Sequence, residues 1–246
     1  MKNKINKTTL RNICVVALIH FIFSMYYSYL KIGSELIKSP DFLKLSAGGI
    51  QVEDSSNLFF LILYVAPKCL FFLWITNSFV KDLKSNFLYI FLRTSNRTKW
   101  LNTTIIKTII SVFCYEVIFM GSIIILLLCN GLKVSAGDII KVFVLEFFQM
   151  VMLALFSNGM QLFLSETACV FGTIFATAVP LIIAGVVYEN NGMWEYPAKW
   201  IPFNWGNYNY MIACNLNVSV AVLCIWVACV LIYLFSKWKI NKYELI

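Results

Sequence analysis

Three ionisable residues, Lys68, Glu116 and Glu146, interrupt apolar stretches that are long enough to cross a membrane. His20 and Gln149 are neutral polar residues in similar surroundings. A charged side chain inside a bilayer is costly unless it is paired or hydrated, so such residues usually serve ion or substrate pathways. These five residues are therefore the candidates for ion binding or for lining a translocation path.

Lys68 and Glu116 have similar expected depths in the membrane. Lys68 lies ten residues after the outer start of its stretch, and Glu116 lies thirteen residues before the outer end of its own. At the rise of an α-helix these depths differ by about 5 Å, which a lysine side chain can bridge. Consecutive antiparallel helices are usually neighbours, so the sequence predicts a Lys68–Glu116 ion pair. The alternative is that Lys68 snorkels toward water while Glu116 is protonated at a packed interface.

The common motifs of enzymes and metal sites are missing from the sequence. A single histidine excludes a haem with two histidine ligands and a His-rich zinc site. There is no phosphate-binding loop, no G-x-S-x-G elbow and no H-E-x-x-H pair. The eight cysteines form no C-x-x-C pair and lie mostly in apolar runs, where they act as small hydrophobic residues. We expect a chain that is not an enzyme and holds no cofactor or metal.

The composition is that of an integral membrane protein. Hydrophobic residues make up 60% of the 246 residues and charged residues 13%, and the mean hydropathy is +0.78. Soluble domains carry about 25% charged residues, so soluble classes are excluded, nucleic-acid-binding proteins among them despite the net charge of +8. A helix needs roughly 20 apolar residues to cross a bilayer. Six runs qualify, and the sequence predicts one all-α domain, 1–246, with spans at 13–30, 58–80, 105–129, 142–164, 168–187 and 218–235.

The distribution of basic residues predicts the orientation of these spans. Thirteen Lys and Arg residues fall on the side of the N-terminus and six on the opposite side. Because cytoplasmic loops collect Lys and Arg, we expect both termini and the 81–99 loop in the cytoplasm, with Asp54 and Asn191 outside. Lys outnumbers Arg seventeen to three, a composition typical of low-GC Gram-positive bacteria. The expected location is therefore a bacterial cytoplasmic membrane.

The loop between the second and third spans contains an apolar segment too short to cross a bilayer. Its residues are Phe87, Leu88, Tyr89, Ile90, Phe91 and Leu92, followed by Arg93 and Arg97. Seven residues of helix extend only about 10 Å. An apolar helix at the inner surface has to bury its outer face in the bundle, in lipid or in a groove of a partner protein. A docking helix and a simple interfacial anchor are the two interpretations.

The segment 84–107 resembles the coupling-helix region of type II ATP-binding-cassette (ABC) exporter permeases. In that family the loop after the second span ends in a tight arginine-containing turn, similar to 93–97 here, with Asn86 and Thr94 standing where the family usually has Gly and Pro. Six spans, cytoplasmic ends, a basic N-terminus and a very short loop between spans four and five also resemble the family.

The segment before the last span is rich in aromatic residues and contains prolines. The candidates in it are Trp194, Trp200, Pro202, Phe203 and Trp205. Aromatic side chains prefer the membrane–water interface, so an ordinary aromatic belt is one interpretation. The family resemblance implies the other, a re-entrant outer segment made of short helices.

The resemblance implies a permease subunit driven by separate cytoplasmic ATPase subunits, which would hold the ATP and Mg²⁺, and acting with a second permease chain in the lipid bilayer. The small size and the lack of a fused ATPase are similar to permeases that export antimicrobial peptides or confer bacteriocin immunity. One alternative is an ion-coupled secondary carrier that uses the mid-membrane Lys and Glu residues, although the internal repeats frequent in that class are not evident. A membrane anchor or sensor is another, but it leaves those charges without a role.

Overall fold

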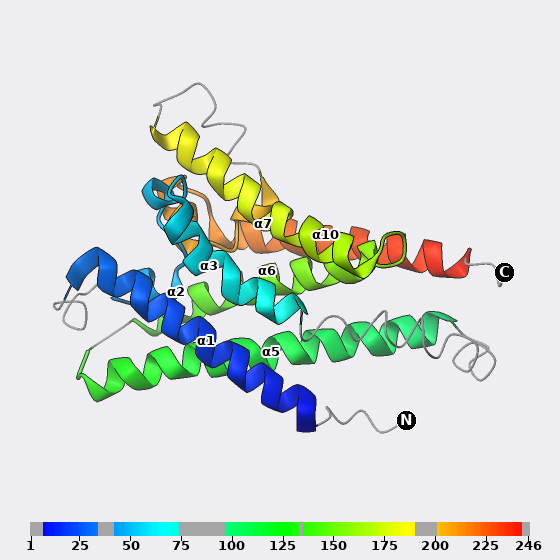
Figure 1. Ribbon diagram of the computed structural model, residues 1–246, viewed down its shortest axis with the longest axis horizontal. Helices are drawn as coiled ribbons and strands as arrows, with labels where there is room; N and C mark the ends of the chain where they lie inside the picture. The colour runs from blue at the N-terminus through cyan, green and yellow to red at the C-terminus, as the bar shows by residue number, and fades with distance from the viewer. Residues whose placement is uncertain (1–6, 34–41, 74–96, 133–134, 190–200, 243–246) are drawn as a thin grey trace.

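The structure is a computed structural model that describes residues 7–33, 42–73, 97–132, 135–189 and 201–242. Every regular element within these residues is a helix. Figure 1 shows six of them running along one bundle: α1 (Lys7–Ile32), α3 (Leu58–Phe71), α5 (Arg97–Cys129), α6 (Ala136–Met160), α7 (Glu166–Glu189) and α10 (Val218–Asn241). The first residue of α1 and the last residue of α10 lie toward the same end.

Five of these helices, all except α3, are long and apolar enough to cross a membrane. They make this chain a multi-pass membrane protein. The helix α3 has 14 residues, about 21 Å, and the part of the predicted second span beyond 73 lies outside the described residues. The six-span topology and its orientation therefore stay predictions.

The helices differ from the predicted spans mainly at their starts. The helix α5 begins at Arg97, eight residues before the predicted start, and its 33 residues extend about 50 Å. The helix α6 begins at Ala136, six residues before the predicted start at 142, and ends at Met160 rather than at 164. A short turn then leads into α7 at Glu166. The predicted spans end at polar residues, but polar side chains are common in the terminal turns of helices that extend beyond the hydrocarbon.

The helix α6 lies at the centre of the bundle. It packs against α5, α7 and α10, while α1 packs against both α3 and α5. Thirteen residues of α6 are buried, against four of α10. The helix α10 instead exposes large apolar side chains such as Leu223, Trp226 and Leu231, as a surface that faces lipid would. Gly159 lets α6 and α10 approach closely, because a Cβ atom at that position would lie 3.0 Å from Ser236 Oγ.

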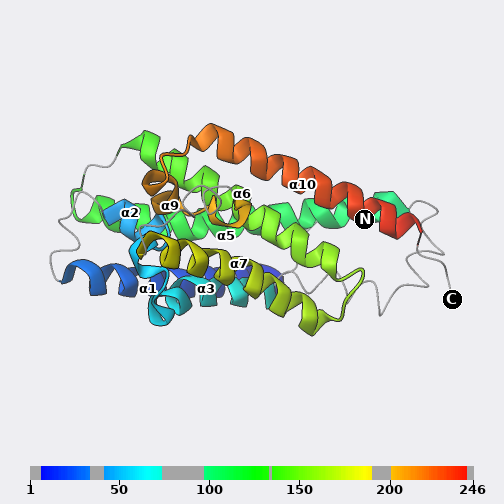
Figure 2. The same ribbon diagram turned by 90° about the horizontal axis from the view of Figure 1, so that it is seen from above.

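Short elements gather at the end of the bundle opposite the start of α1, and we call them the cap (Figure 2). They are α2 (Phe42–Ala47), η2 (Val52–Asp54), η4 (Pro202–Asn204) and α9 (Tyr208–Ala213). Asn209 of α9 joins the two halves of the cap, since its side-chain amide donates to the carbonyl oxygens of Lys44 and Gly49 at 3.0 and 2.8 Å. The predicted re-entrant segment before the last helix does contain short helices, η4 and α9.

The cap contains the same turn twice, 150 residues apart. Each copy is a 3₁₀ turn that ends in a buried residue, Asp54 in the first copy and Asn204 in the second. In each copy an asparagine, Asn57 or Asn207, then directly precedes the next helix. The backbone N–H of Asn57 donates to the Asp54 carbonyl at 3.0 Å, and that of Asn207 donates to the Asn204 carbonyl at 3.1 Å. Each asparagine also accepts a hydrogen bond from a backbone N–H of the first turn that follows. Sequence analysis missed this local repeat because few of the paired residues are alike.

Candidate functional site

A buried ion pair joins α3 and α6 at the centre of the bundle. Lys68 Nζ lies 2.6 Å from Glu146 Oε1, and the two side chains are 1% and 3% exposed. Lys68 is ten residues beyond Leu58, where α3 begins, and Glu146 is ten residues beyond Ala136, where α6 begins. Both helices begin at the cap end, so the two side chains reach the same depth.

The ion pair corrects the prediction that Lys68 pairs with Glu116. The predicted span that contains Glu146 begins at 142, whereas α6 begins at Ala136, so the prediction did not place Glu146 at the depth of Lys68. It also assumed that α3 and α5 are neighbours, whereas α3 packs mainly against α1 and α7. Lys68 is therefore paired rather than snorkelling, and its partner comes from a helix farther along the chain.

Glu116 on α5 lies beside this pair but is not part of it. It is fully buried, and neither of its carboxylate oxygens has a hydrogen-bond partner among the described residues. It lies close enough to Lys68 and Glu146 to interact electrostatically with both. The three residues form what we call the charge cluster, which has two acidic groups and one basic group.

Tyr64 holds the Lys68 ammonium group in place. Lys68 Nζ donates a hydrogen bond to the Tyr64 hydroxyl at 2.6 Å and lies 3.9 Å from the centre of the Tyr64 ring. The two residues are four apart on α3, so they share one face of the helix. Tyr64 is a functional candidate that the sequence analysis missed, and this spacing was the signal that could have revealed it.

His20 on α1 contacts α5 next to the charge cluster. Its Nδ1 atom lies 2.7 Å from the Tyr115 hydroxyl, and its ring stacks on Phe119 with ring centres 3.8 Å apart. Tyr115 is adjacent to Glu116 in the chain and was also missed by the sequence analysis. His20 is thus a buried hydrogen-bonded residue at the α1–α5 contact, close to the cluster but without an ion-pair partner of its own among the described residues.

A small cavity lies between the charge cluster and the cap. Its volume is about 20 Å³, and His20, Tyr27, Tyr64 and Glu146 contribute to its lining together with the loop at 49–50. A cavity of this size with several polar groups around it can hold one water molecule. The charge cluster thus adjoins, on the side of the cap, a space lined by both polar and apolar side chains.

Gln149, one turn along α6 from Glu146, supports the cap. Its side-chain amide donates to the backbone carbonyl of Phe203, and its side chain fills the space where Gly206 would otherwise carry a Cβ atom. Phe203 packs edge-on against Phe156 of α6, with ring centres 5.7 Å apart. Gln149 therefore belongs to the contact between α6 and η4 rather than to the charge cluster.

The remaining candidates in the re-entrant segment are described only in part. Pro202 is the first residue of η4, a position where its missing N–H costs nothing. Trp205 is 4% exposed and belongs to the core of the cap rather than to a belt of exposed aromatic residues. Trp194 and Trp200 lie outside the described residues.

The predicted docking segment lies almost wholly outside the described residues. This applies to Phe87, Leu88, Tyr89, Ile90, Phe91, Leu92 and Arg93. Arg97 is the first residue of α5. The arrangement of the segment 87–97 as a coupling helix stays a prediction.

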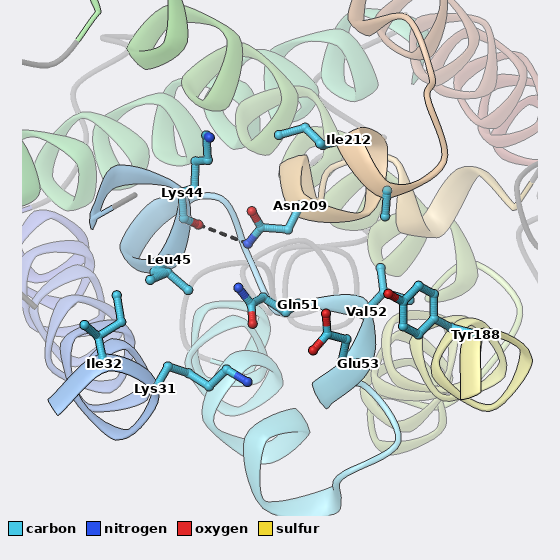
Figure 3. A pocket seen from close by; sticks show the side chains of 11 residues that line it. Lys31, Ile32, Lys44, Leu45, Gln51, Val52, Glu53, Tyr188, Asn209 and Ile212 are labelled. Atoms are coloured by element: carbon cyan, nitrogen blue, oxygen red, sulfur yellow. Dashed lines mark hydrogen bonds between the residues drawn. The ribbon is translucent and has the colours of Figure 1, made fainter. Parts of the chain in front are cut away.

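A larger cavity of about 500 Å³ lies at the surface of the cap (Figure 3). Its lining includes Lys31, Gln51 and Glu53, together with exposed side chains such as Tyr188. Lys31 Nζ forms an ion pair of 2.8 Å with Asp54 Oδ1, and the Tyr27 hydroxyl donates to the other carboxylate oxygen of Asp54 at 2.7 Å. Tyr27 also lines the small cavity, so these hydrogen bonds connect the two cavities.

The part of the chain that the structure describes contains no group of three or more His, Cys, Asp or Glu side chains arranged to hold a metal ion. Comparisons with protein-family models, with characterised proteins and with solved structures find no match for this chain.

Proposed function

We propose that this chain is the membrane-spanning subunit of an ABC exporter of the type II class. The observation that carries the proposal is the cap segment between α7 and α10, where η4 and α9 fold back onto α6 and α7. Short helices at this point of the chain are what the family resemblance implies. The helix α1 begins and α10 ends at the same end of the bundle. This arrangement also supports the proposal, since both termini of such a permease face its ATPase.

The energy for transport comes from separate ATPase subunits in this proposal. The chain has no phosphate-binding loop, so ATP and Mg²⁺ bind to the partner subunits. The segment 87–92, with Arg93 and Arg97, is the docking element, and a second permease chain completes the transporter. The substrate class is an antimicrobial peptide or another amphipathic toxic compound, which the transporter exports from a bacterial cytoplasmic membrane to give immunity.

A double substitution in the docking segment tests the proposal. Phe87→Asp with Phe91→Asp introduces charge into the face that docks, so the ATPase should no longer co-purify with the tagged permease and export should stop. Tyr188→Asp is the matched control, because Tyr188 is an exposed aromatic residue at the cap end. Normal insertion of both variants is checked by protease protection in membrane vesicles. A double variant that still recovers the ATPase and still exports would contradict the proposal.

The charge cluster favours a second candidate function, an ion-coupled secondary carrier. The charge cluster is fully buried. Buried charged residues of this kind form the coupling-ion sites of carriers. The two functions are separated by their energy source. Depletion of ATP with the ion gradients held by an artificial potential stops the ABC transporter, whereas a protonophore in the presence of ATP stops the carrier.

A further inference from the structure

We propose that Glu116 binds an exchangeable proton, which reaches it from the cap through Asp54, Tyr27 and the small cavity. This inference goes beyond the proposed function, because it holds whether ATP or an ion gradient drives transport.

The charge balance of the cluster calls for one bound proton. Lys68 and Glu146 neutralise one another across 2.6 Å. Glu116 is a second acidic group with no exposed surface and no hydrogen-bond donor at either carboxylate oxygen among the described residues. An ionised carboxylate in such a place lacks compensation for its lost hydration, and a buried acidic group in this situation takes up a proton instead.

None of the neighbouring polar groups compensates an ionised Glu116. The hydroxyl of Tyr64 on α3 is engaged with Lys68, and the hydroxyl of Tyr115 on α5 is engaged with His20 of α1. Glu146 on α6 adds a second negative charge, which disfavours ionisation of Glu116 further. The cation of Lys68 acts in the opposite direction, but Glu146 already balances it at contact distance.

A proton fits the site better than a metal ion does. Hard cations such as Ca²⁺ and Mg²⁺ need six or more oxygen ligands, part of them from water. The Lys68 ammonium group already occupies Glu146 at 2.6 Å and would repel a second cation, and the small cavity of about 20 Å³ has room for one water molecule only.

Hydrogen bonds connect the surface of the cap to the small cavity, which adjoins the charge cluster. Lys31 lines the larger cavity and holds Asp54, and Asp54 accepts a hydrogen bond from the Tyr27 hydroxyl at 2.7 Å. Tyr27 and Glu146 both line the small cavity. When Asp54 takes up a proton from water, its hydrogen bond with Tyr27 reverses, and the Tyr27 hydroxyl turns its hydrogen toward the small cavity. Asp54 then passes its proton to the Tyr27 oxygen while Tyr27 releases its own proton to a water molecule that enters the cavity. From there the proton reaches Glu146 and then Glu116, so each group except Glu116 returns to its starting state.

Infrared difference spectroscopy on the purified full chain, in lipid nanodiscs over a pH titration, tests the proposal. The wild-type protein should show the C=O band of a protonated carboxyl group at neutral pH, and Glu116→Gln should abolish that band. Asp138→Asn is the control, because Asp138 is 38% exposed and lies away from the cluster, and it should leave the band unchanged. A band that survives in Glu116→Gln would overturn the proposal.

Two further variants test the balance of charge and the route. Glu146→Gln should also remove the band, because Glu116 then ionises as the counter-ion of Lys68. Tyr27→Phe should keep the band at equilibrium but slow its change after a pH jump several-fold. An unchanged rate would overturn the route.

The stability of the same variants is a separate measurement that also tests the protonation of Glu116. Glu116→Gln should be as stable as the wild type, because the amide has the shape and neutrality of the protonated acid, whereas Glu146→Gln should be less stable. Equal destabilisation by both substitutions would show that Glu116 is ionised and would overturn the proton assignment.

Discussion

The Asn207 side chain interlocks the two copies of the turn in the cap. Its Nδ2 atom donates at 2.6 Å to the backbone carbonyl of Ile50, two residues before η2. Its Oδ1 atom accepts from the Tyr210 backbone N–H at 3.1 Å. Asn57, the equivalent residue of the first copy, caps its helix but is exposed. Asn57 and Asn207 thus both cap a helix, but only Asn207 also connects the two copies of the turn.

This difference predicts unequal effects of one substitution at two equivalent sites. Asn57→Ala removes a helix N-cap and should cost about 1 kcal/mol of unfolding free energy. Asn207→Ala also leaves the buried Ile50 carbonyl without its donor, which adds roughly 1–3 kcal/mol. Unfolding of both variants in mixed detergent–SDS micelles measures the difference. Equal losses would mean that the bond to Ile50 does not hold the cap together.

The Lys68–Glu146 pair predicts a strongly non-additive double-mutant cycle. Lys68→Met leaves Glu146 as an uncompensated buried charge and should cost roughly 3–5 kcal/mol. Glu146→Gln should cost less, because Glu116 then ionises as the counter-ion of Lys68. The combined substitution removes both charges and should cost clearly less than the sum of the two. The measurement is again unfolding free energy in mixed micelles.

The Lys31–Asp54 pair is the control for this cycle. Its lysine side chain is 24% exposed, so solvent screens the pair and the coupling should be smaller. Additive losses for Lys68 and Glu146 would show that the two side chains do not interact in the membrane-embedded protein.

Much of the bundle could be predicted from the sequence, because apolar runs of helical length have only one stable form in lipid. The class of protein, the approximate positions of five long helices and the short helices before α10 agree with the structure. The ion pair could not be predicted, because its register depends on where α6 begins. Polar residues between 136 and 142 gave no sign that the helix already extends through them.

Side-chain partners within the cluster were harder to predict than the cluster itself. Lys68, Glu116 and Glu146 were recognised by their cost in an apolar setting, and the structure does bring them together. Which carboxylate meets the lysine depends on α1 lying between α3 and α5, a neighbour relation that the order of spans does not reveal. Gln149 was assigned to the same group by its polarity alone, although it supports the cap.

Two glycines with the same backbone conformation predict different tolerance to alanine. Gly49 has φ +89°, and a Cβ atom there would lie 2.8 Å from the Asn207 side chain. Gly33 has φ +74°, and no atom of the described residues would lie within 4 Å of a Cβ atom there. Gly33→Ala should therefore cost only the backbone strain of a left-handed residue, about 1 kcal/mol. Gly49→Ala carries that strain and also displaces Asn207, so its thermal denaturation in detergent should occur at a clearly lower temperature. Similar melting temperatures would contradict the close contact in the cap.

The last prediction concerns which end of the bundle faces outward. The excess of basic residues on the side of the N-terminus predicts that the cap is external. Glu53→Cys places a thiol at an exposed position of the cap, and Lys99→Cys places one at an exposed position in the first turn of α5, near the opposite end. Both are made in a Cys129→Ser background, because Cys129 is itself exposed at the end of α5 nearer the cap. A membrane-impermeant maleimide should label position 53 in intact cells and position 99 only after permeabilisation. The reverse pattern would invert the topology, and with it the direction from which protons enter the cluster.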